Sequence, residues 1–216
     1  MNMKKYKSIL FDLDGTLTDP AQGLTLGFEY ALYKMGMPPE SREALRRFIG
    51  PPLLDVWQTE YGLTKAESER MIALFREYYD IYGWWDNTPY PDIENQLGLL
   101  KDRGYRLFVA TSKPERTAKR VLSLFGLDKY FEFIGGAESG SERYTKTAVL
   151  KYVLESTGAE PSDAILVGDR MYDAEGAAQV GIDSLGVLWG HGSRTEIESS
   201  GFTGIIEHIA DLSAVF

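Results

Sequence analysis

Hydrophobic positions along this chain follow three successive patterns. Residues 8–11 form a short apolar run, which predicts a buried strand. From residue 20 to residue 82 the apolar residues recur at helical spacing and no strand pattern interrupts them. That stretch predicts consecutive helices over 20–35, 40–49, 52–61 and 65–82. After residue 86 short apolar runs alternate with further helical stretches.

The alternating part predicts a parallel sheet with helices on both faces. Strands are expected over residues 106–111, 131–134, 164–168 and 184–188. Helices are expected over residues 92–103, 114–125, 146–156 and 174–180, and further helices close the chain. Because these strands are apolar without alternation, they favour a sheet that is buried on both sides. We therefore expect an α/β fold with a doubly wound, mostly parallel, Rossmann-like sheet that includes the first strand.

The long helical stretch interrupts the sheet part, so it is predicted to be an inserted all-helical domain. We expect a core made of residues 1–17 and 86–216, and a helical insertion over residues 18–85. Trp84 and Trp85 stand where the insertion returns to the core, and we expect them to pack at this hinge.

The composition narrows the class of protein and of partner. The chain has 216 residues, with 32 acidic against 23 basic side chains and a formal net charge of −9. This excess of acids argues against nucleic acid or an anionic membrane as the main partner, but it permits a small anionic substrate. The absence of cysteine excludes disulfides, thiolate metal sites and cysteine nucleophiles. The polar amino terminus and the lack of a long apolar run predict a cytoplasmic protein.

The first strand ends in two acids, Asp12 and Asp14, followed by Gly15. Two carboxylates this close repel each other unless a cation or a shared proton relieves the repulsion. Mg²⁺ prefers oxygen ligands, and with such an ion present one carboxylate can attack an electrophile while the other transfers a proton. The alternative is an ordinary turn rich in Asp and Gly, which is common after strands.

Two other polar segments follow predicted strands. Thr111, Ser112 and Lys113 come at the end of the second strand, and Asp169 follows a later strand, with Asp173 four positions further on. In open parallel sheets, ligands bind outside the carboxyl ends of the strands. We therefore expect these segments to converge with the first strand's acids at one site.

These motifs resemble those of the haloacid dehalogenase superfamily, in the phosphoglycolate phosphatase-like branch with a helical cap. The family's first motif matches Asp12-Leu-Asp14-Gly-Thr16, and its second matches Thr111. The third motif, a lysine that opens a helix, best matches Lys146, and the fourth matches Gly168-Asp169 with Asp173. The resemblance covers essentially the whole chain, and it implies that residues 18–85 are the cap.

The resemblance implies a role for each matched residue. Asp12 would be the nucleophile that forms an aspartyl-phosphate, and Asp14 would protonate the leaving oxygen and then activate water. Mg²⁺ would be held by the Asp12 carboxylate, the backbone carbonyl of Asp14, and Asp169. Asp173 would orient ligands or waters from outside that set. The residues expected to bind the transferring phosphoryl group are Thr111, Ser112 and Lys146.

Some of these positions have competing interpretations. Arg143 competes with Lys146 for the third motif, because this segment lacks the Lys-Pro pair common in the branch. Thr111 fits a helix start equally, and Lys113 fits either a substrate contact or a surface charge. His191 follows the last predicted strand and is interpreted as a loop residue rather than as a base.

Substrate choice is assigned to the cap, which closes over the sheet in such enzymes. The turn over residues 48–53 resembles the specificity loop of this branch, and within it Gly50 and Leu53 are candidate specificity residues. Arg46 and Arg47 precede the turn and are expected either to meet an anionic part of the substrate or to be solvated.

Together with the paired acids, the resemblance implies a Mg²⁺-dependent phosphatase that acts, as a monomer or homodimer, on a small phosphorylated metabolite; phosphoglycolate and nucleoside monophosphates are the substrates that the branch suggests. One alternative is a sugar phosphomutase, but those carry two adjacent acids where this chain has Asp169-Arg170. A phosphonate hydrolase would need a cap lysine in a recognisable motif, and Lys34 and Lys65 are not in one. A phospho-accepting regulatory module would lack the large helical insertion.

Overall fold

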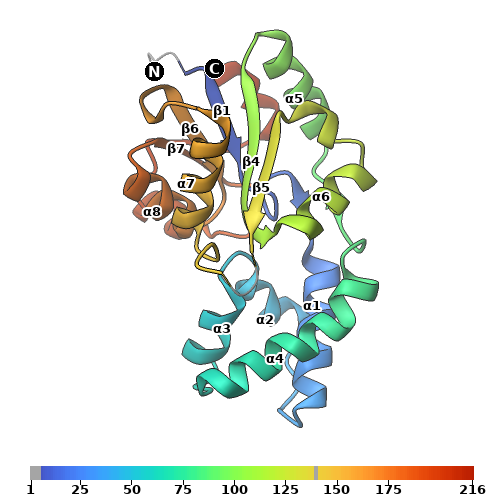
Figure 1. The fold of residues 1–216 in the computed structure, drawn as a ribbon. Helices are drawn as coiled ribbons and strands as arrows, with labels where there is room; N and C mark the ends of the chain where they lie inside the picture. The colour runs from blue at the N-terminus through green and yellow to red at the C-terminus, as the bar shows by residue number, and fades with distance from the viewer. Residues whose placement is uncertain (1–5, 139–140) are drawn as a thin grey trace.

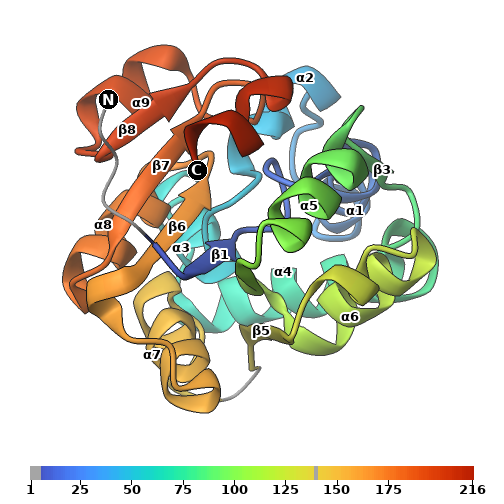
Figure 2. The ribbon, with the colours of Figure 1, turned by 90° about the horizontal axis from the view of Figure 1, so that it is seen from above.

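The first apolar run forms the central strand of a six-stranded parallel sheet in the computed structural model, which describes residues 6–138 and 141–216. The strand order is β5-β4-β1-β6-β7-β8, and each neighbouring pair is parallel (Figures 1 and 2). The strands are β1 (Ser8–Phe11), β4 (Arg106–Pro114), β5 (Phe133–Ala137), β6 (Ala164–Gly168), β7 (Asp183–Val187) and β8 (Gly204–Ile206). The predicted α/β fold with a parallel sheet is confirmed.

Helices cover both faces of this sheet, as Figures 1 and 2 show. On one face lie α5 (Ile93–Asp102) and α6 (Glu115–Leu124), and on the other lie α7 (Lys146–Thr157) and α8 (Met171–Val180). The alternation of β1 explains the two layers, because Ile9 and Phe11 join one hydrophobic cluster while Leu10 joins the other. Burial of each such side chain stabilises the fold by about 1.5–3 kcal/mol.

A second helical group lies beyond the carboxyl ends of the strands (Figure 1). Its members, which we call the cap helices, are α1 (Ala21–Lys34), α2 (Arg42–Leu45), η1 (Arg46–Phe48), α3 (Leu53–Thr59), α4 (Lys65–Tyr78) and the π-helical turn η2 (Tyr79–Gly83). They have a hydrophobic cluster of their own, centred on Phe28, whose ring packs against those of Phe48, Trp57 and Phe75. A capping box between Thr64 and Glu67 begins α4.

The chain enters and leaves the cap helices through two short paired strands. These are β2 (Thr18–Asp19) and β3 (Thr88–Pro89), which pair antiparallel. Trp84 packs against hydrophobic residues of both the core and the cap helices. Trp85 is half exposed beside them. We call residues 18–19 and 84–89, where the chain passes between the sheet and the cap helices, the hinge.

The structure corrects several expected elements. The end of the chain was predicted to be helical, but β8 pairs with β7 as the sixth strand of the sheet. With only three residues it is too short to show a pattern. Residues 40–49 form a short helix and a 3-10 turn instead of one long helix. The remaining elements are η3 (Asp128–Tyr130), η4 (Pro161–Asp163), α9 (Arg194–Ser199), η5 (Ile209–Asp211) and η6 (Ser213–Val215).

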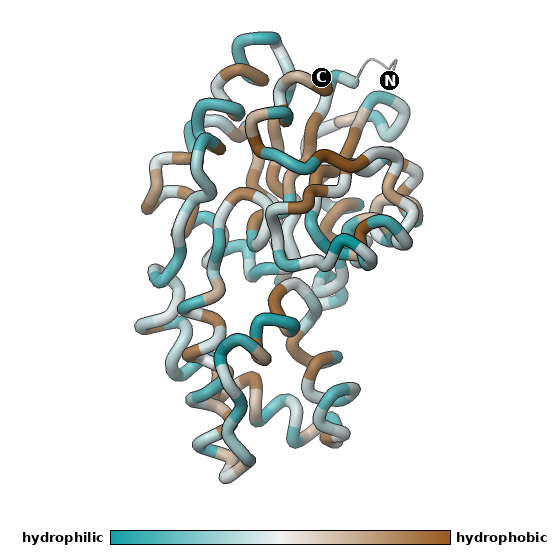
Figure 3. Tube along the Cα trace, turned by 180° about the vertical axis from the view of Figure 1, so that it is seen from behind, coloured by the Kyte–Doolittle hydropathy of each residue, from teal (hydrophilic) through white to brown (hydrophobic). Residues whose placement is uncertain are grey.

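Hydrophobic stretches gather along the strands in the interior, as the hydropathy colouring of Figure 3 shows. All four residues of β1 and all five of β6 are buried, which explains why these strands lack polar alternation. Among the described residues, no helix combines the length and the apolar character needed to cross a bilayer.

Candidate active site

Asp12 directly follows β1, at the point where the strand order reverses. The chain builds β4 and β5 on one side of β1, and β6, β7 and β8 on the other, so the reversal lies between β1 and β6. The Asp12 N–H donates to the carbonyl oxygen of Val167 in β6 at 2.9 Å. Ligands of open parallel sheets bind at such a reversal, and the topology therefore places Asp12 at the predicted site.

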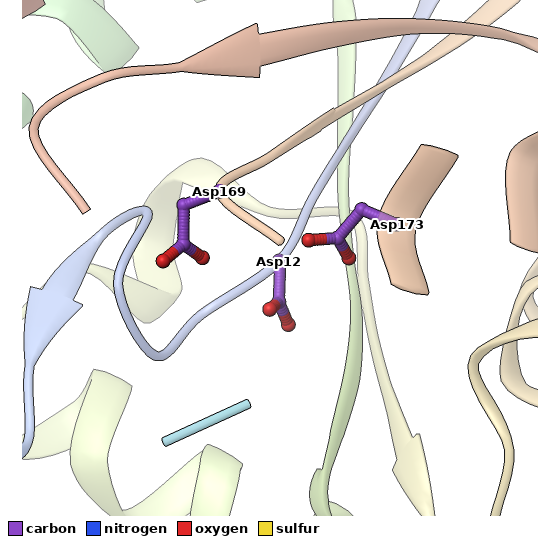
Figure 4. A group of neighbouring side chains, drawn as sticks. All are labelled: Asp12, Asp169 and Asp173. Atoms are coloured by element: carbon purple, nitrogen blue, oxygen red, sulfur yellow. The ribbon is translucent and has the colours of Figure 1, made fainter. Parts of the chain in front are cut away.

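Three buried carboxylates meet beyond the ends of β1 and β6 (Figure 4). Ligand oxygens of Asp12, Asp169 and Asp173 all lie within 4.8 Å of one another. Asp169 follows β6 directly, whereas Asp173 lies in the first turn of α8, a helix that begins three residues earlier than the sequence pattern indicated. We expected Asp173 to act from outside the ligand set; its carboxylate has an oxygen within 4.8 Å of oxygens of Asp12 and Asp169.

The carboxylate of Asp169 is held by the loops around it. It accepts hydrogen bonds from the Thr16 hydroxyl at 3.3 Å and from the His191 backbone N–H at 2.7 Å. Gly15 has a φ of +89°, and a Cβ at this position would lie 2.1 Å from Oδ2 of Asp169. The turn after β1 therefore requires glycine, because both the backbone conformation and the space exclude a side chain.

Lys146 supplies the positive charge next to these carboxylates. Its Nζ lies 2.8 Å from Oδ1 of Asp12 and 2.8 Å from Oδ1 of Asp173, and it donates to the carbonyl oxygen of Ala110 at 3.0 Å. Burial lowers the pKa of Lys146, but the two carboxylates outweigh burial and hold its pKa above the ordinary value. Lys146 is therefore protonated and lies beside the predicted nucleophile.

Arg143, the competitor of Lys146, lies elsewhere. Its guanidinium is 3.5 Å from a carboxylate oxygen of Glu115 and 3.6 Å from one of Glu138, and it stacks over the ring of Tyr152. These partners hold Arg143 between α6, α7 and the end of β5. Of the two candidates, the geometry brings Lys146 to Asp12.

The cluster of Asp12, Asp169 and Asp173, which we call the carboxylate group, is suited to bind a divalent cation. Ionisation of all three carboxylates beside one ammonium would leave two negative charges in a buried space. Burial is the main reason that the pKa of Asp169 lies well above its ordinary value, and it raises the pKa of Asp173 to about 6. A hard ion with oxygen ligands would relieve both the burial cost and the mutual repulsion. The Asp14 side chain is not in this group.

Asp14 pairs with Lys113 instead. The Lys113 ammonium donates to both carboxylate oxygens of Asp14, at 2.9 Å and 2.7 Å, and its side chain is only 3% exposed. The alternative that Lys113 is a surface charge is therefore wrong. Burial raises the pKa of the Asp14 carboxyl, and the Lys113 ammonium opposes that rise without cancelling it. A carboxyl with a raised pKa is suited to donate a proton.

A cavity of about 110 Å³ lies between Asp12 and the cap helices. Its core wall includes Thr111 and Ser112, and Thr111 lies within β4, so the interpretation of Thr111 as a helix start is wrong. The Thr111 hydroxyl oxygen accepts a hydrogen bond from the Lys113 N–H at 3.2 Å, which leaves its own hydrogen to donate. The cap side of the wall includes Gly50, Leu53, Phe75, Arg76, Tyr79 and Asp80.

The structure does not bring Arg46 and Arg47 to this cavity. Arg46 lies 3.7 Å from Asp19 and lines a separate hollow at the hinge, together with Trp85. Arg47 pairs with Glu40 at 2.8 Å on the surface. Their separation from Asp12 depends on how the cap helices are oriented, which the local sequence does not indicate.

Arg76 and Tyr79 line the cavity, and the sequence reasoning gave neither a role. Tyr79 begins η2, within the stretch over 65–82 that the sequence predicts as a helix, and the Lys113 ammonium lies 5.2 Å from the centre of its ring. Arg76 sits one position after the buried Phe75. Only the docking of α4 over the sheet distinguishes these side chains from ordinary cap residues.

His191 is a loop residue, as expected, and its ring is buried. Its Nε2 lies 3.3 Å from a carboxylate oxygen of Asp19 in β2. The same residue holds Asp169 through its backbone N–H. His191 thus contacts both the carboxylate group and the hinge.

Comparison with known proteins agrees with this arrangement. The family model described as haloacid dehalogenase-like hydrolase matches residues 9–187. The crystal structure of a protein described as a predicted phosphatase from Clostridium acetobutylicum superposes with a TM-score of 0.96, at 37% identity over 98% of both chains.

The names of other relatives refer to different activities. A Pseudomonas aeruginosa protein named 5'-nucleotidase is 36% identical over 98% of this chain and 94% of its own length. A Mycobacterium tuberculosis protein named tyrosine-protein kinase PtkA is 37% identical over 94% of this chain and 69% of its own length. A phosphoglycolate phosphatase of Aquifex aeolicus is 34% identical over 85% of each chain.

Proposed function

The chain belongs to the haloacid dehalogenase-like hydrolase family, and we propose that it hydrolyses a small phosphomonoester through a phosphorylated Asp12. The observation that carries this proposal is the position of Asp12, whose carboxylate borders both Lys146 and the group formed with Asp169 and Asp173. A nucleophilic carboxylate beside fixed positive charge is what phosphoryl transfer requires.

In the first half-reaction a carboxylate oxygen of Asp12 attacks phosphorus and the bond to the leaving oxygen breaks. Asp14 in its protonated form donates its proton to that oxygen, so the leaving group departs as a neutral alcohol, and the Asp14 carboxylate that remains pairs with the Lys113 ammonium. Lys146, Thr111 and Ser112 donate hydrogen bonds to the phosphoryl oxygens, whose charge is spread in the transition state.

In the second half-reaction Asp14, now ionised, removes a proton from water. The oxygen of that water attacks phosphorus, the bond to Asp12 breaks, and inorganic phosphate leaves. Asp12, Asp169 and the backbone carbonyl of Asp14 would hold Mg²⁺, which when bound would supply positive charge to neutralise the phosphoryl oxygens. We include the Asp173 carboxylate as an orienting group for that ion, because its distance from Asp12 and Asp169 suits the role.

The cap helices, which we assign to residues 18–85, are proposed to close the cavity and select the leaving group. The cavity beside Asp12 measures about 110 Å³, which suits a leaving group of a few heavy atoms, as in phosphoglycolate. A nucleoside monophosphate would extend through Leu53 and Arg76 into an adjoining hollow of about 410 Å³. Relatives named for both substrates support these two candidates.

Transfer to a sugar hydroxyl is the less favoured outcome. The position after Asp169 is Arg170, whose guanidinium contacts Glu196 and the cap turn and adds no second acid at the site. We therefore favour water over a sugar hydroxyl as the acceptor of the phosphoryl group.

The test is a screen of phosphomonoesters with and without Mg²⁺, on the wild-type chain and on Asp12→Asn. We expect release of inorganic phosphate from small substrates, dependence on the ion, and loss of turnover in the variant by roughly 10³-fold or more. Full activity in excess chelator, or substantial turnover by Asp12→Asn, would contradict the proposal. ATP with a tyrosine-containing peptide belongs in the same screen, because one relative is named as a tyrosine kinase.

A further inference from the structure

Arg170 reaches from the carboxylate group to the cap. Its backbone N–H donates to Oδ2 of Asp173 at 3.0 Å, and it directly follows Asp169 in the chain. Its side chain runs in the opposite direction and donates through Nη1 to the backbone carbonyl oxygen of Ile49. Ile49 is 1% exposed and belongs to the hydrophobic cluster of the cap helices. The contact therefore joins the core to the packed body of the cap.

Glu196 fixes the other side of the guanidinium. Its Oε1 accepts from Arg170 Nε at 2.8 Å and from the backbone N–H of Met171 at 2.9 Å. Glu196 itself lies in the first turn of α9, where Ser193 caps the helix. Because Nε is held by Glu196, Nη1 is aimed at the carbonyl of Ile49.

Gly50 explains why the two surfaces come so close. Its φ is +111°, and a Cβ there would lie 2.9 Å from Cγ of Arg170 and 3.1 Å from its Nη1. Gly50 also lines the cavity beside Asp12, as Leu53 does. The turn that forms the wall of the cavity is thus the turn that Arg170 contacts.

We propose that Arg170, oriented by Glu196, is a positioning residue that holds the cap turn over residues 49–53 against the core and so keeps the cavity closed. The turn lies over the leaving group, so this proposal rests on the phosphatase function for its kinetic consequence only. Arg170 touches no reacting atom. A hydrogen bond from a charged group to a buried carbonyl is among the stronger single contacts, so its loss should open the turn measurably.

The first test measures opening without reference to activity. Hydrogen–deuterium exchange is followed by mass spectrometry in wild type, Arg170→Ala, Glu196→Gln and Gly50→Ala. Exchange in the peptide that covers residues 46–56 should become at least about tenfold faster in each variant. Exchange in α4, within the cap body, should stay the same. Unchanged exchange over residues 46–56 in Arg170→Ala would overturn the proposal, whatever the activity.

The second test separates positioning of the turn from support of the carboxylate group. In Arg170→Ala and Glu196→Gln, KM for a substrate with a carboxylate-bearing leaving group should rise about tenfold. The Mg²⁺ concentration for half-maximal activity should stay within about twofold, since the Arg170 backbone contact to Asp173 is retained. A large rise in that Mg²⁺ concentration with normal exchange would instead assign Arg170 to the ion site and overturn the proposal.

Arg194→Ala is the matched control. Arg194 lies on α9, as Glu196 does, and it pairs with two glutamates, Glu198 at 3.3 Å and Glu207 at 3.0 Å, but its side chain is more than half exposed. Its exchange and kinetics should equal those of wild type. Arg170→Lys keeps the positive charge but lacks the several N–H donors of the guanidinium. Its effects on exchange and on KM should therefore be smaller than those of Arg170→Ala. If wild type hydrolyses no phosphomonoester, the proposed function fails, but the exchange test still decides the role of Arg170.

Discussion

Lys113 Nζ lies 2.7 Å from Oδ2 of Asp14, although the two residues are 99 positions apart. One comes from the end of β4 and the other from the turn after β1, and these strands are neighbours in the sheet. The ion pair is buried, so its orientation is fixed. Lys113 therefore fixes the orientation of the Asp14 carboxyl, the group that we propose to transfer protons.

Asp14→Asn should separate good from poor leaving groups. Because the amide cannot give a proton to the departing oxygen, hydrolysis of alkyl phosphates should fall by roughly 10²–10⁴-fold, and aryl phosphates should lose far less. Steady-state rates on one alkyl and one aryl ester provide the measurement. Equal losses on both would show that Asp14 has only a structural role beside Lys113.

Lys146→Ala should lower kcat for every substrate by a similar factor. Its ammonium lies against Asp12, and we propose that it binds the phosphoryl group that all substrates share, so kcat should fall by roughly 10²–10³-fold across a panel. Arg143→Ala is the control from the same segment, and its kcat should stay within about twofold of wild type because it pairs with Glu115 and Glu138. A reversed result would assign the third motif to Arg143.

Leu53→Ala should change the order of substrates. Leu53 lines the cavity, so its truncation should alter the ratio of kcat/KM between small and large leaving groups by about tenfold. Arg46→Ala should scale all substrates together or leave them unchanged, because Arg46 lies beside Asp19 in the separate hollow. If Arg46→Ala reorders the panel, the hinge hollow contributes to specificity after all.

Stability should depend on Tyr6 in the alkaline range. The Tyr6 hydroxyl donates to Asp183 at 2.9 Å, and burial followed by this bond raises the pKa of Tyr6 to about 12. The folded pKa exceeds the unfolded pKa of about 10, so the contribution is complete below pH 10 and is lost as the pH rises toward 12. Tyr6→Phe should cost about 1 kcal/mol at pH 8 by urea unfolding.

The difference between wild type and Tyr6→Phe should shrink when the same unfolding curves are measured near pH 11.5. The variant cannot ionise at this position, so it supplies its own reference. A difference that is constant over the whole pH range would mean that Tyr6 titrates alike in the folded and unfolded chain.

The sequence predicted those site residues that directly follow a recognisable strand. The apolar run before Asp12 marks a strand, and the parallel order brings the ends of β1, β4 and β6 together, so Asp12, Thr111 and Asp169 were expected to converge. Lys146 was predictable only as one of two candidates, because spacing along the chain does not say which cation reaches Asp12 from the start of α7.

Relationships between distant elements were not predictable. The partners of Lys113 and Arg170 depend on packing, and neither motif alone distinguishes a buried cation from a solvated one. The inclusion of Arg76 in the cavity wall, and the exclusion of Arg46 from it, follow from the orientation of the cap helices. β8 escaped notice because three residues carry too little pattern against the helical turns around them.

The pairing of Thr18 with Pro89 and of Asp19 with Thr88 brings the chain back to the place where it left the core. The segment between these two strands is therefore an insertion whose two ends lie side by side at the sheet. The length and content of such an insertion should have little effect on how the core folds. The sheet, which carries Asp12, and the cap helices, which we propose to select the substrate, can therefore diverge at different rates. We therefore expect that exchanging the cap helices between two relatives at the β2–β3 pair would transfer substrate preference and leave the residues around Asp12 in place.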